Sequence, residues 1–137
     1  MLAHLIDPFT RQIGTVDYRG DQRKIHCCLD AMHIDMMRLN RAGDGMYIDD
    51  DGFAKDPVRQ AYFLYWQESD EGGGGARVVA GKALVVGPLV GGVPVAPTID
   101  VAELARRVIW IDAAHAVAIT SRALRSGSGS RHGALLG

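Results

Sequence analysis

The sequence is poor in cysteine, and the two cysteines that it has do not suit a disulfide framework. In 137 residues there are only Cys27 and Cys28, which are adjacent. Neighbouring cysteines seldom bridge one another, because the small ring that results strains the intervening peptide. This excludes a small disulfide-stapled scaffold and indicates a reducing compartment. The sequence therefore predicts a cytoplasmic protein.

Long apolar runs are also missing. The first apolar run ends at Asp7-Pro8 and has no basic residues before it, which is not typical of a secretory signal peptide. The least polar stretch, residues 83–98, is interrupted repeatedly by glycine and proline. A helix that spans a bilayer needs about 20 consecutive apolar residues. We therefore expect no membrane association.

No single sign of charge dominates the chain. It has 15 basic and 16 acidic side chains and a formal net charge of -1, so direct nucleic-acid binding is not expected. The distribution is uneven, since residues 1–112 carry 12 basic and 16 acidic side chains whereas residues 113–137 carry three arginines and no acid. Three arginines contribute little binding energy at physiological salt.

What remains is the composition of an ordinary globular domain. Hydrophobic residues make up 47% and charged residues 23% of the chain, and its length fits one domain. Short β-branched and aromatic segments alternate with turn residues, which predicts an α+β fold with a small, mostly antiparallel β-sheet and two short helices. We expect the compact domain to cover residues 1–112. Residues 113–137 are expected to form a weak helix followed by a flexible, disordered basic tail.

Turn and capping residues locate the expected elements. The Asp7-Pro8 turn predicts a hairpin at the start of the chain. Asp21 is expected to cap a helix over residues 22–29, and Thr98 or Asp100 a helix over 101–107. The remaining expected segments are strands at 33–39, 46–48, 61–66, 77–86 and 108–111, a flexible loop at 68–75, and a wide hairpin or edge segment at 89–97.

A cluster of aspartates is the first candidate site. A calcium loop that began at Asp49 would need oxygen ligands at its fifth and twelfth positions, but Phe53 and Gln60 stand there, so no metal site is expected. These acids are either solvated turn residues or an acidic patch that faces a partner. The candidate partner-binding residues are Asp44, Asp49, Asp50 and Asp51.

A second candidate site would bind a phosphate. Residues 75–82 fail the phosphate-loop pattern, because five residues separate Gly75 from Gly81 and Ala83 follows Lys82 where a hydroxyl residue is needed. The alternative ligand-binding hypothesis rests on individual side chains, with packing or surface roles as the other interpretation. Its residues are Lys82 and Arg38, which would face phosphate, and His33 and Cys28 nearby; no cofactor is expected.

Three segments of the chain resemble a known group of proteins. They are residues 5–9 (LIDPF), 48–52 (IDDDG) and 80–87 (AGKALVVG). They are similar to a small family of uncharacterised proteins that phages, prophages and plasmids encode, over about residues 1–112. The glycine run at residues 72–75 and the tail depart from this family. The resemblance implies a small accessory protein of a mobile element, and some such proteins disarm host defences such as CRISPR systems.

Together these observations predict a non-enzymatic accessory protein of a phage or mobile element. It would bind and inhibit a defence or regulatory component in the bacterial cytoplasm, either a host protein or a ribonucleoprotein, since an acidic protein can occupy a basic nucleic-acid channel. The alternative is a small-molecule or nucleotide-binding protein or a small enzyme. A flat acidic face favours the first hypothesis, and a pocket with converging polar groups favours the second.

Overall fold

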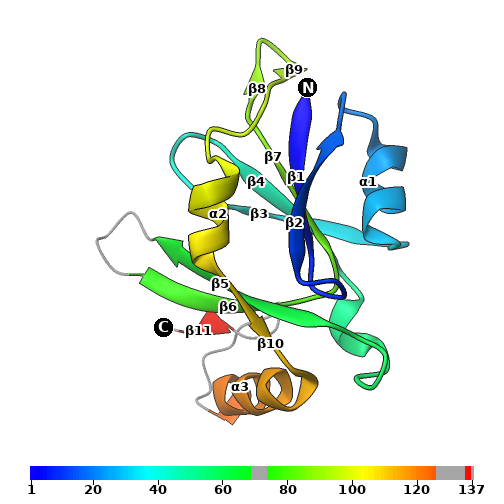
Figure 1. Cartoon of the computed structure of the whole chain (residues 1–137), viewed down its shortest axis with the longest axis vertical. Helices are drawn as coiled ribbons and strands as arrows, with labels where there is room; N and C mark the ends of the chain where they lie inside the picture. Colours follow the sequence, from blue (N-terminus) through cyan, green and yellow to red (C-terminus); the bar gives the residue numbers. More distant parts are fainter. Residues whose placement is uncertain (69–73, 126–134, 137) are drawn as a thin grey trace.

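The computed structural model describes residues 1–68, 74–125 and 135–136 (Figure 1). In these residues the chain forms an α+β fold in which every paired strand is antiparallel. This confirms the predicted fold class. None of the helices in this part of the chain is long and apolar enough to cross a membrane.

Two sheets form the body of the molecule. Sheet A has the strand order β2-β1-β7-β4-β3, and sheet B has the order β10-β5-β6-β11. The strands of sheet A are β1 (Leu2–Asp7), β2 (Gln12–Asp17), β3 (Ile34–Arg38), β4 (Gly45–Asp49) and β7 (Ala83–Val86). Those of sheet B are β5 (Tyr62–Glu68), β6 (Gly74–Ala80), β10 (Val108–Ile111) and β11 (Leu135–Leu136), and β8 (Leu89–Val90) pairs with β9 (Val93–Pro94) in a separate hairpin.

Aspartate caps set the starts of two of the helices. Helix α1 (Gln22–Leu29) begins after Asp21, whose carboxylate accepts the backbone N–H of Arg23 at 3.0 Å. Helix α2 (Val101–Arg107) begins after Asp100, which accepts the N–H of Glu103 at 2.8 Å. Each bond satisfies a donor that the first helical turn leaves free. Both predicted helices are confirmed with their bounds, and Asp100 rather than Thr98 is the cap.

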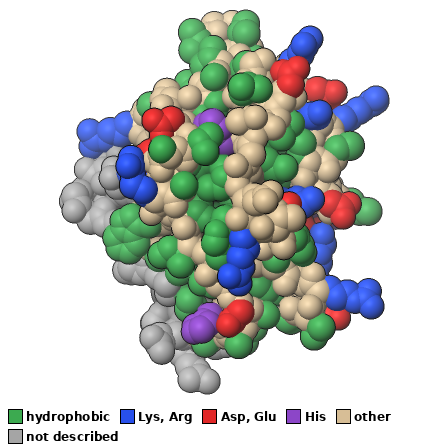
Figure 2. All heavy atoms as spheres, viewed as in Figure 1, with side chains coloured by type: hydrophobic (Ala, Val, Ile, Leu, Met, Phe, Trp, Pro, Cys, Tyr) green, Lys and Arg blue, Asp and Glu red, His purple; other side chains and the backbone are tan. Residues whose placement is uncertain are grey.

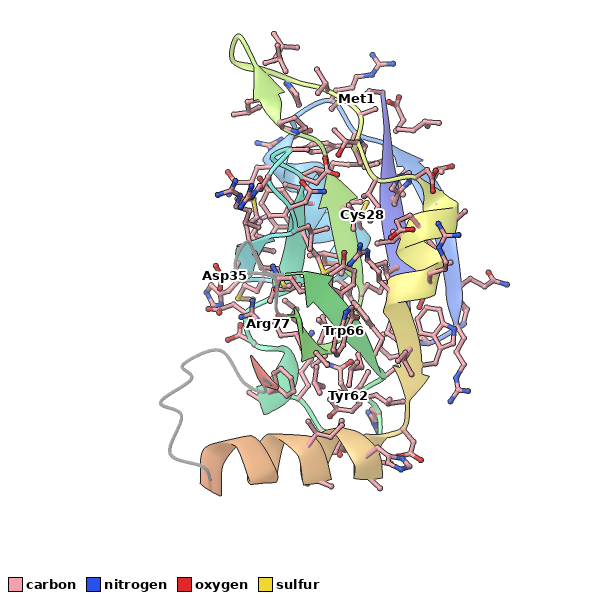
Figure 3. All side chains as sticks on the ribbon, turned by 90° about the vertical axis from the view of Figure 1, so that its left-hand side faces the viewer. Met1, Cys28, Asp35, Tyr62, Trp66 and Arg77 are labelled. Atoms are coloured by element: carbon pink, nitrogen blue, oxygen red, sulfur yellow. The ribbon has the colours of Figure 1, made fainter. Side chains whose placement is uncertain are left out.

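The alternation of side chains along the strands places the helices in layers. In β7, Val85 packs into the core between the two sheets, whereas Leu84 packs on the outer face of sheet A beneath α1. In β6, Val79 faces the same central core and Val78 faces outward. Helix α3 (Ala113–Arg125) covers that outer face of sheet B, where Tyr62 lies next to it (Figure 3). The order of layers is therefore α1, sheet A, sheet B, α3 (Figure 1).

The sequence predicted one strand over residues 77–86, and the structure divides it between the two sheets. Gly81 adopts a left-handed φ of +87° and donates its N–H to the carbonyl of Ala61 at 2.8 Å. The chain ends β6 in sheet B, turns at Gly81 and enters sheet A as β7. A run of β-branched residues does not show such a break, whereas a glycine inside it is the signal for one.

The expected C-terminal segment is partly built into the fold. The predicted weak helix is α3, and its Ala116 is buried with Val78 and Ala80 of sheet B. Strand β11 pairs with β6, with Leu135 opposite Arg77 and Leu136 opposite Ala76. A boundary after residue 112 would therefore cut through a packed layer. Of the expected tail, residues 126–134 and 137 lie outside the described residues, as does most of the expected loop at 68–75.

At Gly87 the backbone packs closely against the backbone of residues 95–96, and this packing can be tested. A Cβ atom there would lie 2.2 Å from the carbonyl oxygen of Val95 and 2.3 Å from that of Ala96, so the backbone would have to move. We expect Gly87→Ala to lower the free energy of unfolding by about 1–3 kcal/mol in urea denaturation. Gly14→Ala is the matched control, because a Cβ there meets nothing within 4 Å. Equal stability of the two variants would contradict this packing.

Candidate functional site

Asp44, the first of the predicted partner-binding residues, is buried. Its carboxylate accepts hydrogen bonds from Asn40 Nδ2 at 2.9 Å, from the N–H and hydroxyl of Thr98 at 2.9 and 2.7 Å, and from the N–H of Ile99 at 2.9 Å. Burial alone would raise the pKa of Asp44, but the bonds from Thr98, Asn40 and Ile99 outweigh it and lower that pKa. With no exposed surface, Asp44 holds the 98–99 segment against sheet A and does not face a partner. This corrects the prediction for Asp44.

Asp49 also points inward, at the end of β4. Its side chain is 3% exposed and forms an ion pair of 2.7 Å with Lys55 Nζ. The other oxygen accepts the backbone N–H of Asp51 at 2.9 Å. The buried Asp49 carboxylate therefore stabilises the turn that follows β4. It is not available to contact a partner directly, which corrects the prediction for Asp49.

Asp50 and Asp51 are the predicted acids that reach the surface. The N–H of Asp50 donates to the carbonyl of His33 at 3.0 Å, and His33 Nδ1 lies 2.7 Å from Asp51 Oδ2. That hydrogen bond, with the charges of the neighbouring aspartates, raises the pKa of His33. We call His33, Asp50 and Asp51 the acidic turn. All three side chains are exposed, and their backbone is held by bonds to buried or paired groups.

Two large apolar side chains flank the acidic turn. Met32 precedes His33 and is 81% exposed, and Phe53 follows Asp51 and is 41% exposed. The Phe53 ring lies against the fold, with its centroid 6.2 Å from that of the Tyr62 ring. The turn thus combines carboxylates with an adaptable methionine and an aromatic ring, a mixture found in protein interfaces.

The four residues of the alternative ligand-binding hypothesis do not form a single site. Lys82 lies near enough to Cys28 for its charge to act on that thiol, although burial dominates and raises the pKa of Cys28. His33 belongs to the acidic turn. Arg38 ends β3 and donates from Nε to the carbonyl of Asn40 at 3.0 Å. Of the four residues, only Lys82 and Cys28 (the latter labelled in Figure 3) lie near one another, and the thiol is not activated there as a nucleophile.

A cleft beside Lys82 was not predicted from the sequence. It has a volume of about 380 Å³ and lies where the β1–β2 turn, the end of α1, the segment before β5 and the Gly81 turn meet. It is lined by Asp7, Phe9, Thr10, Leu29, Asp30, Lys55, Gln60, Gly81 and Lys82. Several of these residues were predicted to lie in turns. However, spacing within a short stretch of sequence cannot show that turns far apart in the chain lie side by side in the fold.

The face of the molecule shown in Figure 2 carries mixed charge. On the face shown in Figure 2, acidic and basic side chains are interspersed with hydrophobic atoms. Within the described ranges, no group of three or more His, Cys, Asp or Glu side chains is placed to hold a metal ion. Comparison of the chain with protein-family models, curated proteins and solved structures gives no match. The residues of the acidic turn and the cleft therefore carry the functional argument.

Proposed function

We propose that this chain is a non-enzymatic binding protein whose acidic turn docks on a basic surface of a bacterial defence or regulatory component and inhibits it. The observation that carries the proposal is the exposure of Asp50 and Asp51 on a turn that the buried carboxylate of Asp49, paired with Lys55, holds in place. Carboxylates presented in this way attract a basic groove, including one that normally receives nucleic acid.

The rigidity of the turn supports this role energetically. Binding costs free energy when loops and side chains must be ordered, and a preformed surface avoids part of that cost. Here the backbone of Asp50 is bonded to His33 and that of Asp51 to Asp49. Met32 and Phe53 would supply the apolar contacts that carry most of the affinity in protein interfaces, with the carboxylates contributing specificity and rate of association.

The biological setting in this proposal comes from the resemblance of the LIDPF, IDDDG and AGKALVVG segments to proteins of phages, prophages and plasmids. It places the protein in the cytoplasm of the bacterial host. There its partner would be a host protein or a ribonucleoprotein such as a CRISPR complex. Asp50 and Asp51 of the acidic turn lie within the second of these three segments.

Charge reversal tests the acidic turn directly. We expect the tagged wild-type protein to retain a specific host component from a bacterial lysate, and the double variant Asp50→Lys/Asp51→Lys to lose at least nine-tenths of it. The reason is that two attractive charges become repulsive at the contact. Retention should also weaken as salt is raised from low to physiological concentration. Mass spectrometry of the retained material gives the measurement.

Asp17→Lys serves as the control for charge alone. Asp17 is exposed at the far end of β2, where it pairs with the N-terminus and Arg19. This variant should retain the same component as the wild-type protein. If the double variant retains its partner unchanged, the acidic turn is not the contact and the proposal fails.

A further inference from the structure

The cleft beside Lys82 has the dimensions and lining of a small-ligand site. Its volume of about 380 Å³ lies within the range of about 300–1,000 Å³ that such sites occupy. Four separate segments build it, from Asp7 at the end of β1 to Lys82 immediately before β7. Several of them are fixed by the core, because α1 packs on sheet A and β7 is buried on both faces. The cleft is therefore largely preformed.

Lys82 is the cation in this cleft that no acid neutralises. Lys55 is committed to Asp49 at 2.7 Å. Lys82 is half-buried and forms no ion pair or hydrogen bond with any residue that the structure describes. Its backbone position is fixed by the left-handed turn at Gly81 on one side and by β7 on the other. A lysine in a cleft lining whose ammonium group has no partner is a ready site for an anion.

Part of the cleft lining is apolar and aromatic. Phe9 is 52% exposed and shares the cleft with Leu29, so a planar ring can stack there and cover surface that is now in water. Asp30 ends α1 in a left-handed conformation, and its carboxylate has no partner within the described ranges. That carboxylate can accept hydrogen bonds from hydroxyl or amino groups of a ligand.

From this arrangement we propose that the cleft binds a nucleoside monophosphate. The base would stack on Phe9, a ribose hydroxyl or a base amino group would donate to Asp30, and the phosphate would pair with Lys82. This is a second site, separate from the acidic turn, and it does not depend on the proposed function.

The charges of the cleft favour one phosphate over three. Lys82 supplies a single free positive charge, whereas Asp7 and Asp30 add negative charge to the lining. A triphosphate would bring more anionic groups than the cleft can pair, and each unpaired one would be repelled by these carboxylates. Discrimination between mono- and triphosphates is therefore part of the proposal.

Isothermal titration calorimetry with AMP, GMP, CMP and UMP tests the site on the full chain. We expect at least one of them to bind with a submillimolar Kd, and the corresponding nucleoside and triphosphate to bind at least tenfold more weakly. The variant Lys82→Ala should weaken the monophosphate at least tenfold and leave the nucleoside unchanged. Phe9→Ala should weaken both. Inorganic phosphate alone should bind only weakly, because it cannot use the aromatic wall.

Lys24→Ala is the matched control, since Lys24 is an exposed lysine on α1 outside the cleft lining. It should bind the monophosphate like the wild-type protein. Circular dichroism melts establish that each variant is folded, and Lys82→Gln replaces Lys82→Ala if the latter is not. The proposal is overturned if none of the four monophosphates binds, if nucleoside and monophosphate bind equally, or if Lys82→Ala has no effect.

Discussion

Replacing Asp44 with alanine is expected to destabilise the protein by about 3 kcal/mol or more in chemical denaturation. The substitution removes the buried acceptor of three part-buried donors, which are the N–H groups of Thr98 and Ile99 and the side-chain amide of Asn40. Each buried donor that loses its partner costs about 1–3 kcal/mol. The loss would loosen the segment that leads into α2 and its buried Leu104.

The same carboxylate makes stability depend on pH. The hydrogen bonds that Asp44 accepts lower its pKa in the folded protein below the ordinary value of about 3.9. As the pH falls, the unfolded chain therefore binds the proton first, so the contribution of Asp44 is complete well above pH 4 and is lost as the pH drops through the folded pKa. Asp44→Asn removes this component of the acid transition.

Asp50→Asn is the control for both measurements, because Asp50 is an exposed acid in the turn that follows β4, whereas Asp44 is a buried acid just before the same strand. Its effect on the free energy of unfolding should stay within about 0.5 kcal/mol. If Asp44→Ala were no more destabilising than Asp50→Asn, the buried network around Thr98 would not support the fold.

Deleting residues 113–137 is expected to destabilise the domain by about 3 kcal/mol or more. The deletion removes α3 and so exposes Tyr62, Val78 and Ala80 on the outer face of sheet B, which are now at most 4% exposed. At about 25 cal/mol per Å² of apolar surface, uncovering such side chains costs a large part of the stability of a small domain. Urea denaturation of the two chains measures the difference.

The shorter deletion of residues 126–137 removes β11 but keeps α3, so it separates the contributions of these two elements to stability. Among the described residues it removes only the pairing of Leu135 and Leu136 with β6, and the expected cost of losing so short a strand is about 1 kcal/mol or less. A chain of residues 1–112 as stable as the whole protein would show that the domain does end at residue 112.

Local signals in the sequence predicted the elements well. The Asp-Pro turn, the caps Asp21 and Asp100, and the aromatic run at 61–66 are each signals within a short stretch of chain, and the structure has the corresponding hairpin, helices and strand β5. Such features depend on backbone conformation and on side chains a few residues away. Sequence patterns record these interactions directly.

The candidate sites could not be predicted as well, because they depend on contacts between residues that are far apart in the sequence. Four aspartates within eight residues look alike as a sequence, but Asp44 is paired with Thr98, far along the chain, and Asp49 with Lys55. A buried and an exposed aspartate differ only in such partners. The cleft was missed for the same reason, because Phe9, Asp30 and Lys82 meet only after both sheets have formed.

The central position of β7 in sheet A has a consequence for synthesis on the ribosome. Both β1 and β4 pair with β7. Ile6 of β1 lies opposite Ala83, so β1 cannot form this pairing until residue 83 has been synthesised. At about 5–20 residues per second, the hairpins made first spend several seconds without that partner. During this interval the inner edges of β1 and β4 are open to other strands, because a sheet edge is a template for any extended chain. The nascent chain is therefore most exposed to misassociation just before the Gly81 turn emerges.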